Sequence, residues 1–86
     1  MMRVLGKDRR QQAYRLSVPL DGREVVALIP EALLSAAHGS TSRVPHQTAY
    51  EWIEREAPAL TRAVRHLISG TRPRAPFDQI TLEPAA

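Results

Sequence analysis

The sequence predicts a small α+β domain with a β-β-α-α-β order, in which a three-stranded antiparallel sheet carries the helices on one face. Three observations predict this fold. Residues 13–29 alternate in polarity around an Asp-Gly pair, residues 48–69 carry one apolar stripe at helical spacing, and residues 79–83 alternate again. At 86 residues, the chain is long enough for one domain.

The N-terminal half contains the hairpin. Residues 14–18 alternate apolar and polar side chains, which is the period of a half-buried strand. Asp21-Gly22 favours a two-residue turn, because such a turn needs positive φ at both central residues. Residues 24–29, rich in β-branched side chains, form the second strand. This loop length predicts three cross-strand pairs on one face: Val18 with Val25, Leu16 with Ala27, and Tyr14 with Ile29.

A short helix should follow the hairpin. Pro30 suits the first turn of a helix, and Gly39 suits the position just beyond its end. The sequence therefore predicts a helix over residues 32–38 that packs on the sheet, followed by a polar loop over residues 39–47.

A longer helix is predicted from Thr48 to Ser69. Thr48 and Glu51 match the capping box, in which each side chain satisfies a free backbone N–H. Pro58 removes a backbone hydrogen bond inside this helix, at a cost of about 3 kcal/mol or more. We predict a kink at Pro58, with a break into two helices as the alternative.

The remaining segments complete the predicted domain. We expect residues 1–12 to form a basic flexible arm with a possible short strand at residues 3–5, residues 13–83 to form the domain, and residues 84–86 to be frayed. The predicted core consists of Leu16, Val18, Val25, Ala27, Ile29, Leu33, Ile53, Leu60, Val64, Leu67 and Ile80.

Two stretches of the chain resemble a known family. The run from Asp21 to Leu33, Asp-Gly-Arg-Glu-Val-Val-Ala-Leu-Ile-Pro-Glu-Ala-Leu, joins a hairpin strand directly to a helix, and the helical stretch 50–68 leads to a strand at residues 79–82. This arrangement resembles a family of short proteobacterial proteins catalogued as Domain of Unknown Function 1488. The resemblance implies the order of elements and no catalytic residue, because the family offers none.

Composition argues against several functions. The chain has no cysteine, which removes disulfides, thiol nucleophiles and thiolate metal sites and favours a reducing compartment. No apolar run is long enough for a membrane helix, and the N-terminus lacks the apolar stretch of a signal peptide. We therefore expect a soluble cytoplasmic protein.

Catalytic and metal-binding patterns are weak. The three histidines, His38, His46 and His66, are not paired at the spacing of two-histidine metal sites. No Gly-x-Ser-x-Gly elbow is present. The stretch 39–43, Gly-Ser-Thr-Ser-Arg, could form an anion nest, but it lacks the phosphate-loop lysine, and a solvated loop is the favoured interpretation. We expect no catalytic residue, no cofactor and no metal, and hence no enzyme.

The basic residues form two groups. The formal net charge is +3, yet residues 1–15 carry five basic side chains against one acidic, and residues 62–74 carry four basic side chains and no acidic one. Such groups can neutralise phosphates, so the alternative function is nucleic-acid binding. Its candidate contacts are Arg9, Arg10, Arg62, Arg65, Arg72 and Arg74.

Protein–protein binding is the favoured function. A sheet of three strands leaves its edges open to a partner, and its second face is only half covered. Large amphipathic side chains are typical anchors of interfaces. The sequence therefore predicts a non-enzymatic binding or regulatory module that binds a protein partner or a second copy, with candidate contacts at Tyr14, Val26, Leu28, Tyr50 and Trp52.

Overall fold

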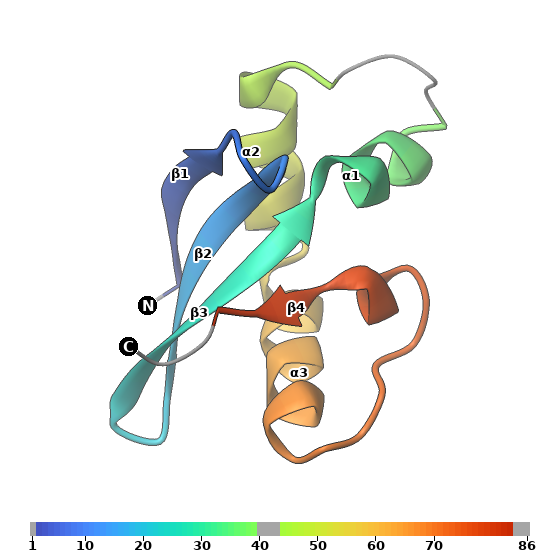
Figure 1. Ribbon diagram of the computed structural model, residues 1–86. Helices are drawn as coiled ribbons and strands as arrows, with labels where there is room; N and C mark the ends of the chain where they lie inside the picture. The colour runs from blue at the N-terminus through green and yellow to red at the C-terminus, as the bar shows by residue number, and fades with distance from the viewer. Residues whose placement is uncertain (1, 40–43, 84–86) are drawn as a thin grey trace.

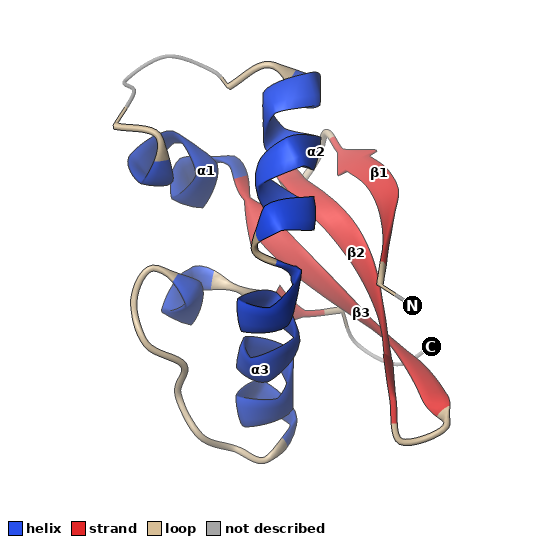
Figure 2. Cartoon of the chain, turned by 180° about the vertical axis from the view of Figure 1, so that it is seen from behind, coloured by secondary structure: helices blue, strands red, loops and turns tan. Residues whose placement is uncertain are grey.

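One antiparallel sheet carries all the helices on a single face in the computed structural model, which describes residues 2–39 and 44–83. The strands follow the order β1-β2-β3-β4. Helices α2 and α3 lie behind the sheet in Figure 1 and in front of it in Figure 2, and α1 continues from the end of β3 at the side of the sheet. The elements are β1 (Arg3–Asp8), β2 (Ala13–Leu20), β3 (Arg23–Pro30), α1 (Glu31–Ala37), α2 (His46–Arg55), α3 (Ala57–Ile68), the 3₁₀ turn η1 (Phe77–Gln79) and β4 (Thr81–Leu82).

The α+β class is confirmed, but the prediction of three strands in a β-β-α-α-β order was wrong. The structure has four strands, and the additional one is β1, which lies within the segment predicted as a flexible arm. A bulge explains why periodicity missed it. Val4 pairs with Leu16 and Lys7 pairs with Tyr14, so the helix-facing positions of β1 are three residues apart instead of two. Gly6, with φ of 124°, provides the backbone conformation for this shift.

The predicted hairpin is confirmed with its register. Val18 lies opposite Val25, and Leu20 lies opposite Arg23, so the loop contains only two residues. Both have positive φ, 51° for Asp21 and 82° for Gly22, as the turn requires.

The long helix is broken in two, which is the alternative interpretation of Pro58. Helix α2 ends at Arg55, α3 begins at Ala57, and Pro58 lies in the first turn of α3, where its missing N–H costs nothing. The prediction of a capping box that begins at Thr48 was wrong. Helix α2 already begins at His46 behind Pro45, so Thr48 is a helical residue, and no side chain caps this end.

The core lies between the sheet and the helices. Nine of the eleven predicted core residues are buried, while Val25 and Leu67 are half-buried against them. The prediction omitted six members of the cluster: Tyr14, Leu20, Leu34, Ala49, Trp52 and Ala63. Two of these are aromatic residues assigned to partner contacts, so a thin core used the largest side chains that the chain offers.

The C-terminal segment returns to the sheet as a shorter strand than predicted. Residues 79–83 were expected to form it, but β4 covers only Thr81–Leu82, which pair with Leu28 and Ala27. The preceding turn η1 places the Phe77 side chain on the core and leads to the buried Ile80. The segment after α3 therefore packs on the core through η1 before it pairs with β3 as β4.

Replacing Leu60 by alanine should destabilise the domain by about 2–5 kcal/mol, because this side chain is fully buried between α3 and the sheet. Ile68→Ala, on the same helix, is the matched control. Ile68 is 41% exposed, so its replacement should cost less than about 0.5 kcal/mol. Urea unfolding followed through the single tryptophan measures both. Equal losses for the two variants would place Leu60 outside the core.

Candidate functional site

The residues expected to contact a protein partner are mostly inside the domain. Tyr14, Leu28 and Trp52 are buried, with 1%, 6% and 8% of their surface exposed. Val26 is half-buried, and only Tyr50 is largely exposed, at 41%. A partner therefore cannot reach the side chains of the three buried residues in this conformation.

An ion pair on the open face of the sheet crosses the strand that carries Leu28. Arg15 on β2 lies opposite Leu28, and its guanidinium donates to both carboxylate oxygens of Glu83, at 2.8 and 2.9 Å. The N–H of Glu83 donates to the carbonyl of Val26, which fixes the carboxylate beside β3. Hydrogen bonds from Arg15 lower the pKa of Glu83, and the same contact raises the pKa of Arg15. The pair ties the segment after β4 to the sheet.

The structure separates the candidate nucleic-acid contacts into two clusters. Arg9 and Arg10 lie in the turn between β1 and β2, whereas Arg62 and Arg65 lie on α3 and Arg74 follows it. The two clusters lie at opposite ends of the molecule, the first high and the second low in Figures 1 and 2. Arg72 is paired with Asp78 at 3.3 Å and does not join either cluster.

A groove of about 240 Å³ runs beside α3, between this helix and the segment that leads to η1. We call its apolar lining residues the floor and its basic lining residues the rim. Ala59, Ala63, Pro73, Ala75 and Phe77 line the floor, and Arg62, His66 and Arg74 supply the rim. No acidic residue is among the described residues that line it, so the groove combines apolar surface with positive charge.

Both walls of the groove are held in place by contacts to the rest of the domain. The Phe77 ring stacks on Trp52, with ring centroids 6.2 Å apart and planes at 29°. Thr71 closes the end of α3, because its N–H and hydroxyl both donate to the His66 carbonyl. Nδ1 of the His66 ring lies 3.0 Å from the same hydroxyl. The groove is therefore formed without a partner, which lowers the entropic cost of binding.

Two cations on the rim lack a compensating charge. Within residues 2–39 and 44–83, neither Arg62 nor Arg74 forms an ion pair or a side-chain hydrogen bond. Arg65 lies just beyond the groove and approaches Asp21 at 3.9 Å, with both side chains exposed, so this pair contributes little. The rim can therefore offer two guanidinium groups to an anionic ligand.

Sequence reasoning found the arginines of this site and missed its floor. Ala59 and Ala63 are four residues apart on the face that also carries Arg62 and His66, and that spacing was a usable signal. Phe77 gave no such signal, because it lies in a proline-rich linker. It reaches the groove only because the segment after α3 turns back towards the sheet at η1.

The other chemical candidates gain no support as sites. The described part of the chain contains no group of three or more side chains suited to holding a metal ion. Nδ1 of His38 lies 2.9 Å from the carbonyl of Leu34, one turn earlier in its own helix. Of the stretch 39–43 that could form an anion nest, residues 40–43 lie outside the described residues. In the described helices, no stretch has the length and apolar character of a membrane span.

Comparison with known proteins gives no relative: no protein family, no curated protein and no solved structure matches the chain significantly. The resemblance to the proteobacterial family of unknown function therefore stays a prediction. The function has to be argued from the geometry alone.

Acid should remove the contribution of the Arg15–Glu83 pair to stability. Because the pKa of folded Glu83 lies below its ordinary value of 4.5, the stabilisation is present above about pH 4.5 and is lost as the pH falls through the folded value. Wild type should therefore have a higher Tm than Glu83→Gln at pH 7, and the gap should narrow as the pH falls below 4.5.

The arginine provides the control for this prediction. With Arg15→Gln as the background, Glu83→Gln should no longer lower Tm more at pH 7 than in acid, because the group that lowers the carboxyl pKa is absent. A gap in Tm that persists unchanged to pH 2.5 in the wild-type background would contradict the assignment of this pair.

Proposed function

We propose that the chain is a non-enzymatic binding module that docks on a protein partner through the groove beside α3. The segment of the partner that it accepts carries an apolar side chain flanked by carboxylates. One observation carries this proposal: the same groove is lined by apolar side chains and by two arginines, Arg62 and Arg74, that form no ion pair with any described residue. The apolar side chain would occupy the floor, and the carboxylates would meet Arg62 and Arg74.

The shape of the floor favours a peptide over a nucleic acid. Sequence-tolerant binding of single strands needs aromatic faces on which bases stack. Among the described residues of the floor, Phe77 already stacks on Trp52, and the others are alanine and proline. Methyl-lined floors of this kind suit aliphatic side chains. A second basic cluster at the opposite end of the molecule does not extend this groove.

The chemistry of the lining supports binding over catalysis. Among the described lining residues, His66 is the only group that could act as a general base, and its Nδ1 is already engaged with Thr71. The rim otherwise offers guanidinium donors. The proposal includes a cytoplasmic location, for which the absence of cysteine from the sequence is the support.

A labelled acidic peptide tests the groove directly. The probe has a leucine and a phenylalanine between two pairs of aspartates, and fluorescence anisotropy at about 150 mM salt measures its affinity. Arg62→Gln combined with Arg74→Gln should weaken binding about tenfold or more, because two charge-assisted contacts are removed. The matched control is Arg23→Gln with Arg55→Gln, which changes the net charge equally at exposed positions outside the groove.

A second variant separates docking from charge attraction. Ala59→Leu fills the groove without changing the charge, and leucine is a good helix former at this position in α3. This variant should bind the peptide probe with an affinity at least about fivefold lower than that of wild type. Equal affinity for a probe with serines in place of its apolar pair would refute docking in the groove.

Nucleic-acid binding and self-association are distinguished by a competition experiment and by sedimentation. A single-stranded RNA that displaces the peptide and binds more tightly, with an affinity that falls steeply between about 50 and 200 mM salt, would establish the alternative function. A mass that rises with concentration in sedimentation, and that Ala59→Leu reduces, would identify the partner as a second copy of the chain.

A further inference from the structure

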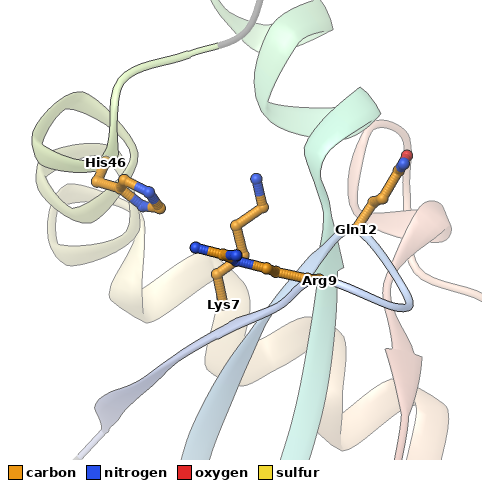
Figure 3. A pocket seen from close by; sticks show the side chains of 4 residues that line it. All are labelled: Lys7, Arg9, Gln12 and His46. Atoms are coloured by element: carbon orange, nitrogen blue, oxygen red, sulfur yellow. The ribbon is translucent and has the colours of Figure 1, made fainter.

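A second cavity, of about 570 Å³, lies at the other end of the molecule and has no role in the proposed function. Its described lining comes from the end of β1, the turn between β1 and β2, and the first turn of α2 (Figure 3). The described residues that line it are Lys7, Arg9, Gln12 and His46, which all offer nitrogen donors.

The turn that carries Arg9 is fixed at both ends. Asp8 accepts hydrogen bonds from the backbone N–H of Arg10 at 2.9 Å and from the side chain of Gln11 at 3.0 Å. The side-chain bond from Gln11 is the main reason that the pKa of Asp8 is lowered. At the other end, the carbonyl of Gln12 accepts a bond from the N–H of Glu31. The Asp8 carboxylate is thus engaged by Arg10 N–H and by Gln11, and it does not pair with the Arg9 guanidinium.

Lys7 and Arg9 differ in how far their charges are compensated. The Lys7 ammonium is 2.6 Å from a carboxylate oxygen of Glu31, and both side chains are largely buried. Arg9 is exposed and forms no ion pair with any described residue. Figure 3 shows the Arg9 guanidinium reaching across the cavity towards His46, while the Lys7 ammonium points to α1. The cavity therefore keeps a net positive charge.

A buried phenol orients His46. The Tyr14 hydroxyl lies 2.9 Å from Nδ1 of His46, and the ring of Tyr14 meets the imidazole edge to face at 5.8 Å. With Nδ1 occupied by the phenol, Nε2 is the nitrogen left for a ligand. When the phenol donates to Nδ1, the proton of the neutral ring is on Nε2, and the protonated ring also carries a proton there. In that tautomer His46 presents its Nε2–H to the cavity as a donor.

We propose that this cavity binds a phosphate group, either free or carried on a small organic molecule. The Arg9 guanidinium in the β1–β2 turn and the His46 imidazole on α2 both offer N–H donors to it, and Lys7 and Gln12 complete its described lining, which suits an anion with several oxygens. The volume exceeds that of a phosphate and falls within the range of small-molecule sites, so there is room for an organic group.

The test is a titration of the full-length chain with inorganic phosphate and with ribose 5-phosphate, followed by ¹H–¹⁵N NMR. We expect saturable shifts confined to residues 6–13 and 45–50, with a Kd of about 1 mM or tighter. Tighter binding of ribose 5-phosphate would identify a phosphomonoester site, and equal binding would identify a site for free phosphate.

Two arginines in the same turn make a matched pair of variants. Arg9→Gln should weaken phosphate binding about tenfold, because its guanidinium lines the cavity. Arg10→Gln removes the same charge from the same turn, but Arg10 does not line the cavity, so this variant should bind within about twofold of wild type. His46→Phe keeps a ring on Tyr14, removes the Nε2 donor and should also weaken binding; Tm reports whether it folds.

Three results would overturn the proposal. The first is the absence of saturation at about 10 mM phosphate. The second is an equal effect of Arg9→Gln and Arg10→Gln, which would indicate attraction to net charge alone. The third is equal affinity for succinate, which would show that the cavity does not select phosphate. The α3 groove takes no part in this experiment, so its outcome is independent of the proposed function.

Discussion

The two-residue reversal at Asp21 and Gly22 sets the register of β2 against β3, and that register decides which side chains the helices cover. With Leu20 opposite Arg23, the residues Tyr14, Leu16 and Val18 all face α2 and α3. A slip of one residue would turn these side chains to solvent and direct Arg15 into the core. The open face receives Arg15 instead, where the guanidinium reaches Glu83 across β3. The core and the surface charges therefore depend on the same turn.

Burial of the aromatic residues gives them a supporting role in place of direct contact with a partner. The ring of Trp52 lies behind Phe77, which lines the groove, and the hydroxyl of Tyr14 lies behind His46, which lines the cavity. In each case a rigid buried ring fixes the orientation of an accessible side chain. Pre-organisation of this kind matters in a thin domain, because few other contacts are available to hold a site in shape.

The break between α2 and α3 also shapes both sites. Because Pro58 cannot occupy the interior of a continuous helix, the chain divides at Glu56, and α2 and α3 follow one another along the sheet (Figure 2). The first half brings His46 to the turn between β1 and β2. The second half carries Arg62 and His66 beside the returning segment. The two basic clusters therefore lie at opposite ends of the α2–α3 stretch.

The sequence by itself determined the α+β class, the hairpin with its register, nine core positions and the arginines that line the groove, because local turn chemistry and periodicity encode these features. Only the tertiary structure decided the rest. The bulge of β1 shifts the phase of the apolar pattern, so Val4 and Lys7 gave no alternation to read. Phe77 and His46 reach their sites through contacts with Trp52 and Tyr14, residues 25 and 32 positions away along the chain. Spacing along the sequence cannot indicate such contacts, because they form only when the fold brings distant segments of the chain together.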